Sequence, residues 1–296
     1  MSSLDGQVIA ISGGGRGLGR AFALHLAERG ARLVVNNRNR IVDDQGLGPA
    51  DHVVAEIRAL GGEAVAEHVD LADPATAQHI VKLALDGWGR LDGLVTSAAV
   101  SGPAMFHKSA PEDFANVLRT NVLGTSQIAA ACAAVMREQR HGRIVLVAST
   151  AGLHGEPTVS AYAASKGAVI ALGKTIAVEG APRGVFTNVL LPYALTQMTD
   201  QGMDPGHREA MDAAAVAPLV AALCDPASTV NGQVIVAASG GLRLADAVEY
   251  GTVRHAAAVD GPGLADLLAA SRSGPAHTYV HAQDAFQDFA RELSAP

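Results

Sequence analysis

The chain has 296 residues, of which 49% are hydrophobic and 17% are charged, a composition typical of a folded globular protein and not of a disordered one. A net charge of −7 argues against the basic face that nucleic acids or anionic membranes require, so we expect neither as a partner. The N-terminal segment lacks the pattern of an export signal, and no apolar run reaches the roughly 18 residues of a membrane span. Cys132 and Cys224 lie in apolar runs and are interpreted as buried thiols, which fits a cytoplasmic location.

Short runs rich in β-branched residues alternate with longer helical patterns through most of the chain. The runs cover residues 7–11, 32–36, 64–69, 91–96, 143–149, 186–191 and 233–237. This alternation predicts an α/β fold, a doubly wound and parallel seven-stranded sheet with helices on both faces. We expect one domain over residues 1–245. Residues 246–296 form a C-terminal extension with helical spacing, which we expect to pack on the core or on a neighbouring subunit.

A glycine-rich segment, SGGGRGLG, joins the first predicted strand to the first predicted helix at residues 12–19. Gly13, Gly17 and Gly19 are spaced for a tight turn into a helix whose free N–H groups and dipole can hold a pyrophosphate. A glycine-rich turn alone is weak evidence, and a purely structural turn is the alternative. Its position between strand and helix favours a dinucleotide site.

The second predicted strand ends in LVVNNRNR, a tip without a carboxylate. NAD sites usually carry an acid here that binds the ribose hydroxyls, whereas arginine suits the 2′-phosphate of NADP. Asn37 and Arg38, with Arg16 approaching from the glycine turn, therefore favour NADP. One alternative is that these arginines are solvated surface charges. Another is that Asp43 or Asp44 folds back toward the ribose and restores NAD.

Three polar residues in the second half of the chain suit proton transfer at a carbonyl oxygen. Tyr162 and Lys166 are four residues apart, which places them on one face of a predicted helix. An ammonium beside a phenol favours phenolate and should lower the tyrosine pKa. Ser149 ends an earlier strand at the edge where open α/β sheets bind ligands. With the glycine turn, the set fits hydride exchange between a nicotinamide and a carbonyl or alcohol carbon, with Tyr162 handling the proton.

Together these segments resemble the short-chain dehydrogenase/reductase family over about residues 5–245. The matching pieces are SGGGRGLG, HVDLAD around Asp70, RTNVLGT around Asn121, Ser149 thirteen residues before Tyr162, YAASK, and NVLLPYALTQMT. The resemblance implies a Rossmann-type fold, a homodimer or homotetramer, and a small-molecule ketone, alcohol or acyl thioester as the substrate.

The resemblance also implies a role for each matching residue. Tyr162 is the acid/base, Lys166 binds the nicotinamide ribose and lowers the tyrosine pKa, and Ser149 holds the substrate oxygen. Asn121 keeps a helix distortion and a water that relays protons to Lys166, while Asp70 faces the adenine. The expected cofactor contacts are Ser12, Gly13, Arg16, Gly17, Leu18, Gly19, Asn37, Arg38, Asp70, Leu71, Ser97, Ala98, Tyr162, Lys166, Pro192 and Thr196.

Some positions depart from the family pattern. TSAA at residues 96–99 replaces the usual Asn-Asn-Ala-Gly after the fourth strand, which we expect to alter strand packing and to weaken or move cofactor contacts. Ser12 replaces threonine but keeps a hydroxyl. Tyr193 stands where the family has glycine and adds bulk near the substrate entrance. His154, Tyr193 and Met198 are the predicted substrate contacts.

Within the family, the loop after VVNN and the segments ADHVVAEIRALGGEAVA, VEGAPRG and LPYALTQMT resemble the (3R)-hydroxyacyl-CoA dehydrogenase branch. The predicted function is hydride transfer between NADP(H) and a ketone or secondary alcohol, with a 3-oxoacyl or 3-hydroxyacyl thioester as a candidate substrate. The alternatives are an NAD-dependent dehydrogenase of a small cyclic or xenobiotic alcohol, and a dinucleotide-binding sensor or scaffold without catalysis. No metal is expected, since no cluster of His, Cys and Asp has ligand spacing.

Overall fold

The computed structural model describes residues 4–38, 42–194, 211–255 and 260–294. By its internal contacts the chain divides into two compact units, Met1–Leu244 and Ala245–Pro296. No helix in the described ranges is long and apolar enough to cross a bilayer.

The first unit is built on an eight-stranded sheet in the order β3-β2-β1-β4-β5-β6-β7-β8. Its strands are β1 (Val8–Ser12), β2 (Arg32–Asn36), β3 (Ala64–Glu67), β4 (Gly93–Thr96), β5 (Gly142–Val147), β6 (Val185–Pro192), β7 (Val234–Ala238) and β8 (Gly241–Leu244). Neighbours from β3 to β7 are parallel, as predicted. Strands β1, β4 and β5 are buried along their whole length, which is typical of a parallel sheet covered on both faces.

The eighth strand corrects the predicted count of seven. β8 pairs antiparallel with β7, from Ile235 opposite Leu244 to Ala238 opposite Gly241. The two-residue turn between them contains Gly240, whose φ of +72° suits a hairpin turn. The sequence of β8, GLRL, has no β-branched residue and is exposed throughout, so it carries none of the signals by which the other strands were recognised.

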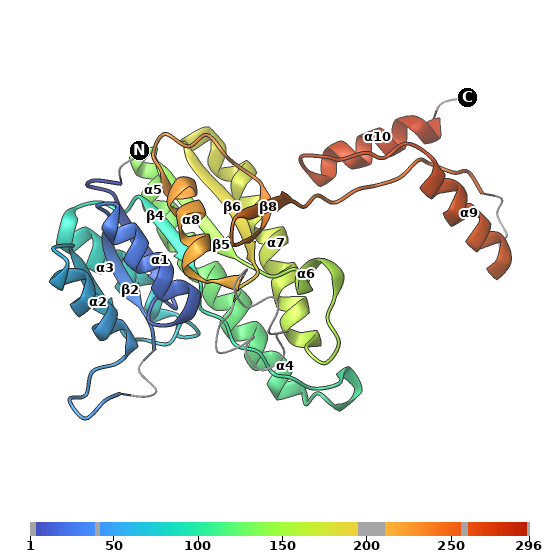
Figure 1. Cartoon of the computed structure of the whole chain (residues 1–296). Coiled ribbons are helices and arrows are strands. Elements are labelled where there is room, and N and C mark those ends of the chain that lie inside the picture. Colours follow the sequence, from blue (N-terminus) through green and yellow to red (C-terminus); the bar gives the residue numbers. More distant parts are fainter. Residues whose placement is uncertain (1–3, 39–41, 195–210, 256–259, 295–296) are drawn as a thin grey trace. The chain divides into compact units, whose positions relative to one another are not determined.

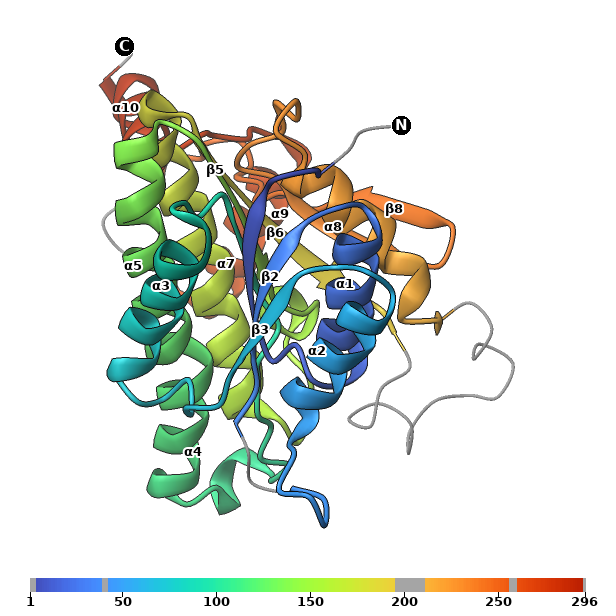
Figure 2. The same ribbon diagram turned by 90° about the vertical axis from the view of Figure 1, so that its left-hand side faces the viewer.

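Helices cover both faces of this sheet (Figure 2). Those of the first unit are α1 (Gly17–Glu28), α2 (Pro49–Ala59), α3 (Ala75–Trp88), α4 (Pro111–Leu118), α5 (Thr125–Gln139), α6 (Ala151–His154), α7 (Ser160–Gly180) and α8 (Ala217–Cys224). Helices α1, α2 and α8 lie on one face, and α3, α5 and α7 lie on the other. Phe22 and Leu26 of α1, one turn apart, are fully buried in the core. Each such side chain contributes about 1.5–3 kcal/mol of burial energy.

The two cysteines are buried, as interpreted from the sequence. Cys132 lies on α5 and Cys224 ends α8, and both thiols are free. Burial raises the pKa of each thiol to about 12. The thiolate, which is the reactive form, is therefore disfavoured at both positions.

The second unit contains α9 (Gly261–Ser273) and α10 (Ala282–Ser294), so the extension is helical as expected (Figure 1). Polar contacts hold it together: Glu249 and His277 exchange backbone hydrogen bonds, and the Tyr279 hydroxyl donates to Asp288 at 2.7 Å. Neither helix has a buried residue. That this unit packs on the core or on a neighbouring subunit stays a prediction.

Candidate active site

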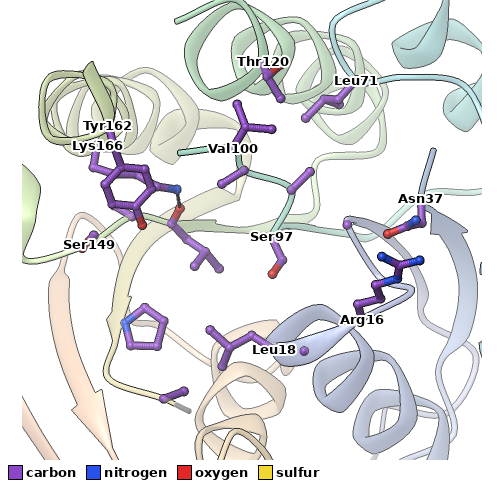
Figure 3. A pocket seen from close by; sticks show the side chains of 18 of the residues that line it. Arg16, Leu18, Asn37, Leu71, Ser97, Val100, Thr120, Ser149, Tyr162 and Lys166 are labelled. Atoms are coloured by element: carbon purple, nitrogen blue, oxygen red, sulfur yellow. Dashed lines mark hydrogen bonds between the residues drawn. The ribbon is translucent and has the colours of Figure 1, made fainter. Parts of the chain in front are cut away.

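The largest group of predicted site residues surrounds one cavity of about 590 Å³ in the first unit (Figure 3). It lies where the parallel strands end at their carboxyl termini, beside the point where the order reverses between β1 and β4. Open α/β sheets bind ligands at such a point. Fifteen predicted residues line it: Gly13, Arg16, Gly17, Leu18, Asn37, Arg38, Asp70, Leu71, Ser97, Ala98, Ser149, Tyr162, Lys166, Pro192 and Tyr193.

The glycine turn forms one wall of this cavity and needs its glycines. Gly13 has a φ of +70°, and a Cβ placed on it would stand 2.5 Å from the backbone nitrogen of Ala98. A Cβ on Gly19 would stand 2.2 Å from the carbonyl oxygen of Gly13. Helix α1 begins at Gly17 without an acidic residue in its first turn. Its free N–H groups and positive dipole end therefore fit the pyrophosphate of a dinucleotide.

Tyr162 and Lys166 lie on α7 and reach the cavity from one side (Figure 3). The Lys166 ammonium lies 5.5 Å from the centre of the Tyr162 ring and donates a hydrogen bond to the carbonyl oxygen of Val147 at 2.8 Å. Only 4% of Lys166 is exposed, and burial lowers its pKa to about 8. The buried ammonium is thus held beside the end of β5, within reach of the same cavity as the phenol.

The Tyr162 phenol titrates in the opposite direction to the one expected from its neighbour. Burial raises its pKa, and a hydrogen bond with Ser149 offsets part of that rise. The Lys166 ammonium points at the Val147 carbonyl, and burial disfavours the charged form of both groups. The phenol is therefore neutral near pH 7 and carries the proton that a general acid donates.

Asn121 lies behind the cavity instead of lining it. It sits in a π-helical turn, Arg119–Gly124, where α4 gives way to α5. Its side chain is 1% exposed; Oδ1 accepts from the Val100 N–H at 2.8 Å, and Nδ2 donates to the Val100 carbonyl and to Ser165 Oγ. The Ser165 hydroxyl donates in turn to the Tyr162 carbonyl at 2.7 Å. Asn121 therefore ties the loop after β4 to the helix that carries the tyrosine.

The TSAA segment does not disturb the sheet. Thr96 is paired with Ser12 of β1 on one side and with Leu146 of β5 on the other. The Ser97 N–H donates to the Ser12 carbonyl at 2.9 Å, and the Ala98 backbone packs under Gly13. That TSAA changes strand packing relative to the family pattern stays a prediction. Ser97, Ala98 and Ala99 form part of the cavity wall.

Charged residues gather at the end of the cavity formed by β2 and β3. Arg16 and Asn37 lie side by side there (Figure 3), and Arg38 Nη1 lies 2.8 Å from Asp70 Oδ2. Asp43, by contrast, serves its own loop: its carboxylate accepts from the N–H groups of Gln45 and Leu47, 2.9 Å from each, and pairs with His52. Neither Asp43 nor Asp44 lines the cavity.

Some predicted residues lie elsewhere. Ser12 is buried at the end of β1, Gly19 packs on the glycine turn, and exposed His154 ends α6 outside the lining. Thr196 and Met198 fall outside the described residues. Eight lining residues were not predicted, each near a strand end or a predicted residue, a signal that could have found them: Asn36, Ala99, Val100, Thr120, Val147, Ala148, Thr150 and Ala194. Across the described ranges, no three His, Cys, Asp or Glu side chains form a metal-ligand set.

The chain is similar to known proteins over most of its length. The family model described as short chain dehydrogenase matches residues 7–205. A short-chain type dehydrogenase/reductase of Mycobacterium tuberculosis is 38% identical over 81% of this chain and 85% of its own length. A 3-oxoacyl-[acyl-carrier-protein] reductase of Synechocystis is 37% identical over 68% of this chain and 79% of its own.

A solved structure extends the likeness to nearly the whole chain. It is the full-length peroxisomal multifunctional enzyme type 2 of Drosophila melanogaster, which superposes with a TM-score of 0.80 at 29% identity. The match covers 98% of this chain and 50% of that one. This chain therefore spans about half of the length of that multifunctional protein.

Proposed function

This chain belongs to the short-chain dehydrogenase/reductase family, and we propose that it is an NADP(H)-dependent oxidoreductase that interconverts 3-oxoacyl and 3-hydroxyacyl thioesters. Members of the family act on hydroxyl and keto groups with a nicotinamide dinucleotide. The observation that carries the proposal is that a glycine turn, a neutral half-buried phenol, a buried ammonium and a serine hydroxyl line the same cavity. The dinucleotide, when bound, supplies the hydride donor or acceptor.

In this proposal Tyr162 handles the proton. During reduction its neutral phenol donates a proton to the oxygen of the substrate carbonyl, and in the reverse direction the phenolate takes that proton back. Its raised pKa supports the acid role near neutral pH. Ser149, which hydrogen-bonds the phenol, orients the same substrate oxygen.

Lys166 and Asn121 support the phenol in different ways. The Lys166 ammonium, which lines the same cavity 5.5 Å from the centre of the Tyr162 ring, would hold the nicotinamide ribose beside the phenol. Asn121 acts by position, because its amide fixes both the loop after β4 and, through Ser165, the helix around Tyr162. The glycine turn, Asn37 and Ser97 would hold the dinucleotide.

The choice of NADP(H) rests on the charges at the β2 end of the cavity. No carboxylate follows β2 directly, Arg16 and Arg38 both line the cavity, and Asp43 is engaged in its own loop. An arginine fork binds a phosphate with paired hydrogen bonds. An NAD-dependent enzyme is the alternative outcome of the test below.

The thioester substrate is supported by two similarities. The Synechocystis relative is named for a 3-oxoacyl substrate, and the fly protein is a multifunctional enzyme whose structure superposes on nearly this whole chain. Membership in the family supports a homo-oligomer, and exposed Leu123, in the Asn121 turn, and exposed Val178, on α7, are available for such an interface. Light scattering of the purified protein would give the subunit number.

The test follows oxidation of NADPH and, separately, NADH by purified protein with acetoacetyl-CoA, and with cyclohexanone as a small ketone. We expect turnover with acetoacetyl-CoA and NADPH, and turnover lost in Tyr162→Phe but kept in Tyr250→Phe, which removes a hydroxyl from the second unit. Turnover with cyclohexanone alone would contradict the thioester. Faster turnover with NADH would contradict the cofactor. Tight dinucleotide binding without turnover on any ketone would favour a sensor or scaffold.

A further inference from the structure

An ion pair joins two residues at the charged end of the cavity. Arg38 follows β2, Asp70 follows β3, and both line the cavity. Arg38 Nη1 and Asp70 Oδ2 are 2.8 Å apart, and their side chains are 30% and 33% exposed. Arg38 is one of the two arginines that could bind a 2′-phosphate. The ion pair therefore joins a carboxylate to a residue expected to bind that phosphate.

Asp70 is held in place by its own surroundings. Its carbonyl oxygen accepts from the hydroxyl of buried Thr76 at 2.6 Å and from the Asp73 N–H at 2.8 Å. Its Oδ1 accepts from the Ala72 N–H at 3.0 Å, and its Oδ2 accepts from Arg38 Nη1. The carboxylate is therefore a fixed partner, and the longer and more flexible arginine side chain is the one that can change partners.

Arg16 differs from Arg38 in this respect. Its guanidinium lies beside Asn37 and has no ion-pair partner within the described part of the chain (Figure 3). Among the described residues, Arg16 and Arg38 each bring a positive charge to this end of the cavity, and Asp70 brings a negative one. A ribose 2′-phosphate carries close to two negative charges at neutral pH. The site is thus less positive than its two arginines suggest.

We propose that Asp70 sets the preference between phosphorylated and unphosphorylated dinucleotide by competing with the 2′-phosphate for the Arg38 guanidinium. The inference rests on the proposed function, because it needs a dinucleotide in this cavity. A 2′-phosphate has to draw Arg38 away from Asp70, so its binding is opposed by the loss of that ion pair. An unphosphorylated ribose leaves the pair intact. Breaking the Arg38–Asp70 pair costs little free energy, because partly exposed ion pairs are weak.

The test measures dissociation constants of NADPH and NADH by fluorescence titration for the native protein, Asp70→Asn, Arg38→Ala and the double variant. In Asp70→Asn the amide oxygen can still accept from Ala72, and the charge is gone. We expect NADPH to bind about fivefold more tightly in Asp70→Asn and NADH to change by less than about twofold. On the Arg38→Ala background the same substitution should change the NADPH-to-NADH ratio by less than about twofold.

A matched control is available in the Arg20–Glu56 pair, 2.7 Å apart, whose residues do not line this cavity. Glu56→Gln should leave the ratio unchanged. Adenosine 2′,5′-bisphosphate and 5′-AMP, used as competitors, restrict the readout to the adenosine end, where the gain in Asp70→Asn should appear for the bisphosphate alone. A thermal melt shows whether each variant is folded.

Two results would overturn this inference while leaving the proposed function intact: an unchanged ratio in folded Asp70→Asn, or weaker NADPH binding in that variant, which would make Asp70 a support for Arg38. An equal gain on the Arg38→Ala background would also overturn it, since Asp70 would then act on the phosphate directly. Failure of the native protein to bind either dinucleotide would overturn the proposed function and this inference together.

Discussion

The two ends of the cavity differ in how far their charged and polar side chains are exposed to solvent. At the β2 end, Arg16, Arg38 and Asp70 are partly exposed, and their charges meet solvent. At the β5 end, Lys166, Asn121 and Ser165 are nearly or fully buried, and each makes a hydrogen bond to protein. Solvent screens exposed charges, so each changes a binding energy only slightly. Burial can shift the pKa of a group by more than one pH unit. One end is therefore suited to tuning affinity and the other to moving a proton.

The largest effect should come from the buried end. Tyr162→Phe removes the acidic proton and little else, so we expect kcat to fall by about 10²- to 10⁴-fold while the dissociation constant of the dinucleotide changes by less than about twofold. Steady-state kinetics and fluorescence titration measure the two quantities. A parallel loss of dinucleotide binding would show that the phenol also positions the cofactor. Binding and proton transfer would then not be separated between the two ends.

The glycine turn between the two ends should give the next largest effect. Gly13→Ala adds a Cβ 2.5 Å from the Ala98 nitrogen at a φ of +70°, so we expect at least about tenfold weaker dinucleotide binding and a loss of about 2–3 kcal/mol of stability. Gly46→Ala is the matched control, because its φ is +78° but nothing lies within 4 Å of the added atom. Equal losses in both variants would mean that backbone strain and not the close approach matters.

Lys166 links stability to pH at the buried end. Its pKa is about 8 in the folded protein, below the ordinary lysine value of 10.5, so the unfolded chain binds more protons between these pH values and stability rises with pH across that window. Lys166→Met should therefore stabilise the protein by about 2 kcal/mol at pH 7, after loss of the bond to Val147, and should lose this advantage as the pH rises from 8 to 10.5.

Urea unfolding of Lys166→Met at pH 7 and pH 10 tests the sign of the change in the free energy of unfolding. Lys174→Met, on the same helix and half-buried, is the control and should show no such trend. A variant that is less stable at pH 7 would indicate that the ammonium is stabilised by its surroundings despite burial, which would weaken the contrast between the ends.

The smallest effect belongs to the exposed end. Arg16→Ala should weaken NADPH binding by about two- to threefold at low salt, and the difference should shrink at 0.5 M salt because exposed charges are screened. Arg20→Ala, on the same helix but outside this cavity, should leave binding unchanged. A loss that persists at high salt would show that Arg16 makes a desolvated contact, and the two ends would then differ less than their exposure suggests.

Much of the fold followed from local patterns. The seven parallel strands and the helices between them were predicted because buried parallel strands read as apolar β-branched runs and the helices as 3.6-residue patterns. β8 was missed because its four exposed residues carry neither signal. The family resemblance implies a helix distortion at Asn121, but no local pattern predicts that it is a π-helical turn or which atoms that amide binds.

For the site, the chain's order of residues was sufficient to select Tyr162, Lys166, Ser149 and the glycine turn, because spacing on a helix and position at a strand end are local properties. The direction of the Tyr162 pKa and the Arg38–Asp70 pair were decided only by the tertiary structure. Burial depends on every element packed around a group, and a pair 32 residues apart forms only when two neighbouring strands end side by side. Protonation and charge pairing are thus properties of the assembled fold, whereas the candidate residues for proton transfer can be selected from the sequence.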